Sequence, residues 1–560
     1  MNMRNITIKG LKISSIIACC LVASVLLVSC SDMLSVDSKR LTTDTQYDLN
    51  APGDSVYSMF GVLSRLQKLA DSYVLLGELR GELLNVTATS DIYLREINDF
   101  NISSDNIYVN IKDYYAVINN CNYLIQKLDT SVVDKGQKLK LREYAALKAI
   151  RAWTYMQVAL NFKTAKYYDK PILTVADAQK KVPEYTIEQL ADLLIDDLKP
   201  LKDVTYPNLG TIDSYNTSMS YFPVNFVLGD LYLWRGSITG NTADYESAAT
   251  AYHQLMYDNR IVIDKVNTSY WVPVNNTISN DAYINWLNAF SLTNNEVITT
   301  ITCPTDYGQN FYLDSLNNQS KIAPSSISIS NWMKQTYYLN EASNSQGDLR
   351  MYGSIWFKEF STKPTSNNSY TVENGYNFYI YKYKLYKQNV IVYRSSLLYL
   401  RYAEAVNRLH KPKLAFAVLK YGLNSTNLFN EKIVPAKEKT SPLQTYMSFS
   451  DSRFANNVGI RMRGLGNMDK DTTFYTIPKM AGMTDSVLYV EDMIQQELSL
   501  ETAYEGNRFQ DLMRITLRRI QTGEGTAAYL ADKIAAKNTD NKEAIRTKLM
   551  DTNSWYILPK

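Results

Sequence analysis

The sequence predicts a mainly α protein, a scaffold of tetratricopeptide-like helical hairpins with long loop-rich insertions and small strands. Apolar residues recur at spacings of three and four over much of the chain, as they do on one face of a helix. Two neighbouring segments carry the small-and-large residue spacing of a tetratricopeptide pair. Two others, 261–389 and 424–485, are rich in Asn, Ser, Thr, Gly and Tyr and lack this periodicity. These patterns indicate one elaborate body over 51–560.

The first part of the chain shows helical periodicity in several segments. Helices are expected, in order, over 54–70, over 105–128, over 141–162, and from Thr186 to the residues before Pro200. The periodicity lapses between 79 and 100. The segment 141–162 has apolar side chains on two faces, with alanines along one of them. Such a helix must be covered on both sides, and the alanines permit close approach.

Two hairpins are expected from residue spacing. The segment 221–234 contains Leu228-Gly229-x-x-Tyr232, and 244–256 contains Ala248-x-x-x-Tyr252-x-x-Leu255. The consensus alanine of the repeat falls near position 241, which predicts an insertion of about seven residues in the turn. A further hairpin is expected at 397–409 and 412–423, with Pro412 at a first helical position. Each repeat needs neighbours to bury its face, so the dispersed hairpins should stack.

The insertions at 261–389 and 424–485 are expected to form loops and small strands laid over the helical frame. Short alternating runs such as Tyr381-Lys382-Tyr383-Lys384 predict strands. Loops held by a rigid frame are a usual place for a binding surface.

The N-terminus has the order of a secretory signal. Arg4, Lys9 and Lys12 precede the apolar-or-serine run 13–28, which is short for a membrane span. The run ends in Leu27-Val28-Ser29-Cys30, the pattern of a bacterial lipobox. We therefore expect a lipoprotein signal peptide over 1–29, acylation of Cys30 with chains such as palmitate, and a flexible stalk over 30–50. The alternative is an ordinary signal peptide in which Cys30 is incidental.

Charge and composition exclude some classes of partner. The signal carries three of the 59 Lys and Arg residues and none of the 56 Asp and Glu residues, so the mature chain has a formal net charge of zero. A chain whose positive and negative charges balance lacks the excess of positive charge that is typical of nucleic-acid-binding proteins. Of the cysteines outside the signal and lipobox, Cys121 and Cys303 are expected to be buried free thiols, with a disulfide between them as the alternative.

No cofactor or metal site is expected. His253 and His410 are the only histidines, too few for a multi-histidine metal site. The run Asn467-x-Asp469-x-Asp471 begins like a calcium loop, but Thr472 and Pro478 stand where an EF-hand needs glycine and glutamate. A solvated turn is the better interpretation.

The segment 491–515 carries Glu497, Glu501 and Glu505 at four-residue spacing, followed by Arg508. These residue types also occur as catalytic carboxylates and phosphate clamps, but we expect a buried or semi-buried ion-pair network. Gly506 lies inside the segment, where glycine costs about 1 kcal/mol against alanine in a helix. It therefore predicts either close packing or a break between two helices.

These last residues resemble the C-terminal signature of the SusD/RagB family of Bacteroidota outer-membrane nutrient-binding lipoproteins. The matching residues are Glu497-Leu498-Ser499-Leu500-Glu501, Tyr504-Glu505-Gly506-Asn507-Arg508-Phe509 and Asp511-Leu512-Met513-Arg514. Further matches lie in order along the chain: Arg151-Ala152-Trp153-Thr154-Tyr155, Asn295-Glu296-Val297-Ile298, Leu400-Arg401-Tyr402-Ala403-Glu404-Ala405-Val406-Asn407, Gly459-Ile460-Arg461 and Trp555-Tyr556-Ile557-Leu558-Pro559. The chain departs from the family in having only Asp32 as an acidic residue close behind Cys30.

The resemblance implies tetratricopeptide-like helix pairs with a variable ligand face. It also implies a lipid-anchored protein of the cell outer membrane, facing the exterior, that works with a SusC-like TonB-dependent transporter. Such a protein captures an oligosaccharide, or an oligopeptide as the alternative, and delivers it without catalysis.

Ligand contacts are expected from aromatic side chains that lie off the helical stripes, because a sugar ring packs its C–H bonds on an aromatic plane. The candidates are Tyr93, Arg95, Trp271, Trp286, Trp332 and Tyr337, and core packing is the alternative role for each.

Two other function classes remain open. A surface glycosidase would need two carboxylates across a cleft, and no pair is singled out by the sequence. A structural scaffold is the other, since tetratricopeptide stacks often bind proteins.

Overall fold

The structure is a computed structural model. It describes residues 54–558 except 135, 139, 209, 213–214, 264–289, 291–295, 303–311, 339–343, 361–362, 365–369, 372–374, 386–388, 441 and 466–474. The chain divides into two compact units, Met1–Ser55 and Val56–Lys560. The predicted signal peptide, Cys30 and the stalk lie outside the described residues. Apart from 54 and 55, the described residues all belong to the second unit.

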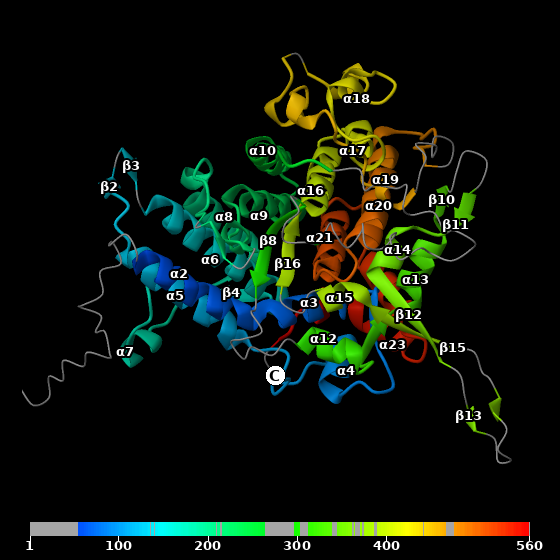
Figure 1. Ribbon diagram of the computed structural model, residues 1–560, viewed down its shortest axis with the longest axis horizontal. Helices are drawn as coiled ribbons and strands as arrows, with labels where there is room; N and C mark the ends of the chain where they lie inside the picture. The colour runs from blue at the N-terminus through cyan, green and yellow to red at the C-terminus, as the bar shows by residue number, and fades with distance from the viewer. Residues whose placement is uncertain are drawn as a thin grey trace, which may run out of the picture. The chain divides into compact units, whose positions relative to one another are not determined.

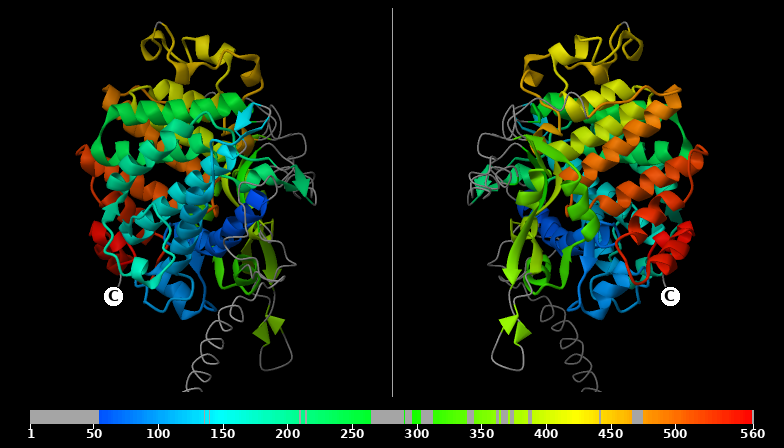
Figure 2. Two further views of the ribbon diagram at one scale, coloured as in Figure 1. Left: turned by 90° about the vertical axis from the view of Figure 1, so that its left-hand side faces the viewer. Right: turned by 90° about the vertical axis from the view of Figure 1, so that its right-hand side faces the viewer.

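A stack of helices forms the frame of the second unit (Figures 1 and 2). Its helices are α2 (Asp54–Leu66), α3 (Ala70–Glu78), α5 (Ile111–Lys127), α6 (Leu141–Phe162), α8 (Ile187–Leu198), α9 (Val224–Thr239), α10 (Thr242–Asn259), α16 (Ser395–Arg408), α17 (Pro412–Lys420), α20 (Met483–Glu501), α21 (Arg508–Gln521), α22 (Ala528–Ala535) and α23 (Lys542–Leu549). Along the stack α5 contacts α6, α6 contacts α8, and α8 contacts α9. Then α9 contacts α10, and α10 contacts α16. The predicted helical-hairpin scaffold is confirmed.

Most predicted helices are present, with some shifted ends. Helix α6 has the predicted bounds, and Thr186 caps α8 in a capping box with Gln189. The helix predicted from 105 begins instead at Ile111, because Asn110 caps it and its side chain accepts a hydrogen bond from the Lys112 N–H. A helix that the lapse in periodicity did not predict, α4 (Ile92–Asn98), lies between α3 and α5 and is capped by Asp91.

The turn between α9 and α10 corrects one prediction. No seven-residue insertion is present, because α9 continues to Thr239 and α10 begins at Thr242. The extra residues extend the helices, and the turn consists of Gly240 with φ 74° and Asn241, which caps α10. The predicted close approach is confirmed, since a Cβ at Gly229 would lie 2.3 Å from the Tyr252 ring.

The insertion at 261–389 is joined to the frame by a strand pair. Strands β8 (Val297–Thr302) and β16 (Asn389–Arg394) pair antiparallel, and β16 leads directly into α16. The other strands also form antiparallel pairs: β1 (Leu84–Val86) with β9 (Ile322–Pro324), β2 (Val133–Asp134) with β3 (Gln137–Lys138), β4 (Thr164–Lys166) with β5 (Glu184–Thr186), β6 (Thr211–Ile212) with β7 (Tyr215–Asn216), β10 (Thr336–Tyr338) with β11 (Asn344–Gln346), β12 (Ile355–Phe360) with β15 (Gly375–Ile380), and β13 (Lys363–Pro364) with β14 (Tyr370–Thr371).

Short helices complete the insertions and connections. They are α7 (Val175–Ala178), α12 (Tyr312–Asn318), α13 (Ser326–Met333), α14 (Arg350–Ser354), α15 (Tyr381–Leu385), α18 (Ser425–Phe429) and α19 (Met462–Leu465). Helix α15 corrects the expectation of a strand at Tyr381–Lys384. Strand β15 ends just before it at Ile380, and the buried Lys382 binds the chain after α20. Tertiary contact therefore overrides the alternating pattern.

Gly506 lies between α20 and α21, so the predicted break is present. The residue has φ 90°, a conformation that favours glycine. Gly77 of α3 packs against it, and a Cβ at Gly77 would lie 1.8 Å from the Gly506 carbonyl oxygen. The Glu78 carboxylate accepts hydrogen bonds from the Tyr504 and Gly506 N–H groups at 3.1 and 2.8 Å. The first helices of the body are thereby joined to the last ones.

Within the part of the chain that the structure describes, no helix combines the length and the apolar character that crossing a membrane requires.

Replacing Gly77 with alanine tests the contact between α3 and the α20–α21 turn. The new Cβ would overlap backbone atoms of Gly506, so Gly77→Ala is expected to lower the free energy of unfolding by about 3 kcal/mol. Gly61 of α2 is the matched control, because a Cβ there meets nothing within 4 Å. Gly61→Ala should raise the free energy of unfolding by up to about 1 kcal/mol. Urea denaturation measures both, and equal stability of Gly77→Ala and the wild type would contradict the close contact.

Candidate ligand-binding site

The pairing of β1 with β9 joins the insertion to the N-terminal part of the frame. Val86 pairs with Ile322, and the loop after β1 is hydrogen-bonded to the turn before β9. The Thr87 and Thr89 hydroxyl groups donate to the Ser320 carbonyl oxygen at 2.5 and 2.9 Å. Residues far apart in sequence therefore form one continuous surface, which we call the β1–β9 surface and which includes loop 87–91.

An aromatic pair lies beside this surface. Trp356 of β12 and Tyr379 of β15 face each other across the strand pair, with ring centroids 5.8 Å apart. The Trp356 side chain is 51% exposed. Tyr379 Oη and Ser320 Oγ are 3.4 Å apart, which places the pair next to the turn that binds Thr87 and Thr89. An exposed apolar plane thus adjoins polar loops, although sequence reasoning did not select Trp356.

A polar cavity of about 390 Å³ adjoins the first residues of loop 87–91. Its lining is composed of Asn85, Val86, Thr87, Ala88, Arg95, Asn98, Asp99, Lys537, Asn538, Thr539, Asp540 and Asn541. The Arg95 guanidinium donates to the Thr87 and Ala88 carbonyl oxygens at 2.7 and 3.0 Å, and it holds the loop in shape. We call this cavity the amide pocket, after its asparagines.

Some buried polar atoms of the amide pocket have no partner among the described residues. The Asn98 side chain is 2% exposed, and its Nδ2 donates to Asn538 Oδ1 at 3.0 Å. Asn98 Oδ1 and Asn538 Nδ2 make no hydrogen bond in the described part of the structure. A buried polar group without a partner costs about 1–3 kcal/mol. Because a hydroxyl group both donates and accepts, a hydroxyl-bearing ligand is suited to this pair.

Lys537 is the buried cation of the pocket lining. Its Nζ donates to the Leu79 and Leu84 carbonyl oxygens at 2.6 and 2.9 Å. Burial lowers the pKa of this ammonium from 10.5 to about 7. The charge of the pocket therefore changes near neutral pH.

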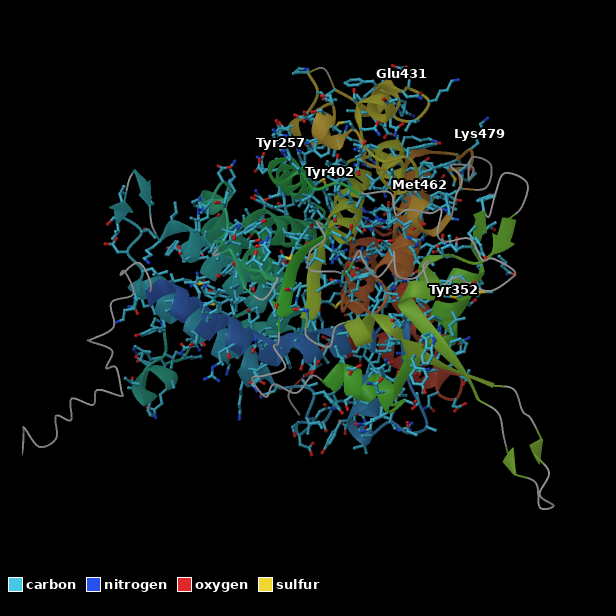
Figure 3. The ribbon with its side chains drawn as sticks, in the orientation of Figure 1. Tyr257, Tyr352, Tyr402, Glu431, Met462 and Lys479 are labelled. Carbon is cyan, nitrogen blue, oxygen red and sulfur yellow. The ribbon has the colours of Figure 1, made fainter. Side chains whose placement is uncertain are left out.

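The structure separates the predicted ligand residues. Arg95 lines the amide pocket, and Tyr93 is half-buried on the neighbouring α4. Trp332 is fully buried, and its Nε1 donates to the Leu500 carbonyl oxygen at 3.2 Å. Tyr337 is 6% exposed and interacts with Tyr352 of α14, which Figure 3 labels.

Trp332 and Tyr337 are therefore core residues, and the prediction that they contact a ligand is corrected. Trp332 lies on α13, which packs on the frame helix α20, and Tyr337 lies on β10, which contacts β11 and α19. Residue type alone does not reveal these contacts. Trp271 and Trp286 lie outside the described residues.

The acidic motif forms the predicted buried network. Glu501 is fully buried, with carboxylate oxygens 2.9 Å from Arg394 and 3.0 Å from both Arg350 and Arg463. Burial alone would raise the pKa of Glu501, but these arginines outweigh it and hold the pKa far below its usual range. Glu501 is thus an ion-pair partner rather than an acid available for proton transfer.

Its neighbours in the motif are paired in the same way. Glu497 binds Arg350 and Arg461 at 3.0 and 3.3 Å. Glu505 binds Lys382 and Arg394 at 2.6 and 2.7 Å. Arg508 binds the Glu82 carboxylate of the chain after α3, with Nη2 at 2.5 Å. These pairs hold the end of α20 and the start of α21 to several other segments.

The described residues contain no group of three or more His, Cys, Asp or Glu side chains placed to hold a metal ion. His253 packs edge-on against Phe449, with centroids 4.9 Å apart, and its Nε2 lies 3.1 Å from the Ser448 carbonyl oxygen. Cys121 is a buried free thiol, and burial raises its pKa to about 12. Cys303 and the run Asn467–Asp471 lie outside the described residues.

The pKa of Lys537 leads to a prediction for stability. Between pH 7 and about 10 the unfolded chain keeps a proton on Lys537 that the folded chain has released. The free energy of unfolding should therefore rise with pH in this window, with up to about 1.4 kcal/mol per pH unit from this residue. Urea denaturation across the window should show a smaller rise for Lys537→Met than for the wild type.

Lys479→Met is the control, because Lys479 is an exposed lysine at the periphery (Figure 3). It removes one lysine without touching the pocket. Identical pH slopes for the wild type and Lys537→Met would contradict a buried, proton-releasing Lys537.

Comparison with solved structures identifies the fold. No family model matches the chain, and no curated protein matches it in sequence. Among solved structures, NanU of B. fragilis is 17% identical and aligns over 88% of this chain and 95% of its own, with a TM-score of 0.56. A SusD superfamily protein of Bacteroides vulgatus is 14% identical over 90% of this chain and 95% of its own, with a TM-score of 0.57.

A third solved structure is described as a SusD-like carbohydrate binding protein of Bacteroides vulgatus. It is 15% identical and covers 83% of this chain and 84% of its own, with a TM-score of 0.52. At such identities the likeness concerns the path of the backbone, and it extends over 83–90% of this chain. The chain has the fold of the SusD superfamily.

Proposed function

We propose that this protein is a nutrient-binding lipoprotein that captures an oligosaccharide and passes it to a SusC-like TonB-dependent transporter, without catalysis. In this proposal Cys30 carries the acyl chains, and the protein is held at the outer membrane facing the cell exterior. The lipobox supports the anchor, and the SusD-superfamily fold supports the binding role. One protein with this fold is described as carbohydrate binding.

The observation that carries the proposal is the exposed Trp356–Tyr379 pair beside polar loops and the amide pocket. A pyranose ring has an apolar face of C–H bonds, which an aromatic plane covers, and a rim of hydroxyl groups. Asparagine amides, carboxylates and an arginine lie along the adjoining loops and pocket. Such a combination of a flat apolar contact and a few polar groups is typical of small-molecule recognition.

An oligopeptide is the alternative ligand, because side-chain amides and carboxylates also bind peptide groups. A glycosidase would have to use carboxylates outside the motif 497–505, whose glutamates are engaged in ion pairs. A scaffold would bind a protein and not a free oligosaccharide. A binding experiment with purified protein separates these classes.

Replacing Trp356 with alanine should weaken capture of the ligand. Removing a stacked aromatic at a binding site costs about 1–3 kcal/mol, so the affinity of Trp356→Ala should fall by about 5- to 150-fold. The protein is first tested against an array of oligosaccharides and oligopeptides, and the best ligand is then titrated by calorimetry. Phe429→Ala is the matched control, because Phe429 is a 56% exposed aromatic residue on α18. Figures 1 and 2 show α18 and the α4 region at opposite ends of the body.

Three results would contradict the proposal. Equal affinities of Trp356→Ala and the wild type would remove the aromatic pair from the site. Binding of peptides in place of glycans would change the ligand class. Hydrolysis of the bound oligosaccharide during incubation would make the protein an enzyme.

Substitution of Cys30 tests the anchor independently of the ligand. Wild-type protein should incorporate an alkyne analogue of palmitate in the cell and sediment with the outer membrane. Cys30→Ala should incorporate none, because the thiol that receives the lipid is absent. Labelling that is equal in both forms, or absent from both, would refute the lipidation of Cys30.

A further inference from the structure

A second cavity, of about 280 Å³, lies between the segment after α4 and the C-terminal tail. Phe100, Asn101 and Ile102 form one side, and residues of α23 and the 3₁₀ helix η9 (Thr552–Trp555) form the other. Helices α4 and α23 lie at the same end of the body (Figures 1 and 2). We call this cavity the tail pocket.

Arg80 lines the tail pocket and is 1% exposed. Its Nε donates to the Leu76 carbonyl oxygen at 2.8 Å, and its Nη1 to the Trp555 carbonyl oxygen at 3.1 Å. Its Nη2 donates to Asn161 Oδ1, and the guanidinium lies 4.3 Å from the centre of the Phe509 ring. A guanidinium has five N–H groups, so these acceptors leave donors unused.

The charge of Arg80 has no counterpart among the described residues. The other fully buried arginines each bind a carboxylate: Arg350 binds Glu497, Arg394 binds Glu501, Arg463 binds Glu296 and Arg514 binds Glu404. In the described part of the chain no carboxylate lies within ion-pair distance of Arg80, and burial lowers its pKa to about 9. An unpaired buried charge is costly, since the desolvation penalty amounts to several kcal/mol.

The rest of the tail pocket adds positive charge and polar donors. Lys548 lines it, and Lys163 Nζ donates to the lining residue Asn553 at 2.7 Å. The acid of the lining, Asp551, caps η9, where its Oδ1 accepts the Asn553 N–H at 2.9 Å. The lining therefore contains an arginine, a lysine, a carboxylate that caps η9, and the aromatic residues Phe100 and Trp555.

We propose that the tail pocket binds a small organic acid, such as a sugar acid, whose carboxylate pairs with the Arg80 guanidinium. The carboxylate supplies the missing counter-charge and accepts the unused N–H groups. The volume limits the ligand to a small molecule, because typical ligand pockets of about 300–1,000 Å³ are larger. This site is distinct from the amide pocket and does not depend on the capture of an oligosaccharide there.

The test uses glucuronate as the charged probe and glucose as its neutral counterpart of similar size. Glucuronate should raise the melting temperature of the full-length protein in a saturable manner, and glucose should leave it unchanged. In titration calorimetry Arg80→Gln should bind glucuronate at least about tenfold more weakly than the wild type. Arg142→Gln, at an exposed arginine of α6 that lines neither pocket, should keep the wild-type affinity for glucuronate.

Arg80 also binds the C-terminal tail at the Trp555 carbonyl oxygen, so its substitution affects more than the pocket. A second pair of variants therefore leaves Arg80 in place and changes another lining residue. Ser554 lines the pocket and is partly exposed. Ser554→Glu introduces a competing carboxylate and should abolish glucuronate binding, whereas Ser554→Gln, of nearly equal size, should retain it. The proposal is overturned if glucose and glucuronate act alike, if inorganic phosphate binds and glucuronate does not, or if both Ser554 variants bind equally.

Discussion

The Glu501 carboxylate is buried between the guanidinium groups of Arg350, Arg394 and Arg463, which come from distant parts of the chain. Taking such charges out of water costs several kcal/mol each, so the arrangement is favourable only when every partner is in place. The connected groups are Arg350, Lys382, Arg394, Arg461 and Arg463 on one side and Glu296, Asp348, Glu497, Glu501 and Glu505 on the other. Their formal charges cancel, which allows them to lie inside the body.

This network determines where the loop-rich segments lie. Arg350 and Lys382 belong to the insertion, Arg394 ends the strand that closes it, and Arg463 belongs to the following loop segment. All of them bind carboxylates at the end of α20 or in the turn that follows it. Helix α20 therefore orients segments whose own sequence has no strong periodicity. Their outer parts, including Trp356 on β12, remain available for contact with a ligand.

The two cavities share one end of the body but differ in charge. Asn98 and Asp99 line the amide pocket, while Phe100 and Asn101 line the tail pocket, so one short turn separates them. Phe100 has a φ of 55°, rare for a bulky residue, and its ring packs 5.6 Å from Phe509. The amide pocket combines acids with lysine and arginine, whereas the tail pocket is lined by Arg80, which has no carboxylate partner among the described residues. This difference is why they suit neutral hydroxyl groups and a carboxylate, respectively.

The local pattern of residues determined the helical frame and the character of the C-terminal motif. Apolar periodicity and the cap at Thr186 predicted α6 and α8 because helices form through contacts between residues three and four apart. The spacing of Glu497, Glu501 and Glu505 likewise indicated a buried network, although not its partners.

The tertiary structure alone decided the exposure of Trp356, the burial of Trp332, the helix at Tyr381 and the members of both pockets. These features arise from contacts between remote residues, such as Arg80 and Trp555, which are 475 positions apart. Residue type and local spacing hold no information about such pairs, so the single sequence cannot show which aromatic side chain faces a ligand and which fills the core.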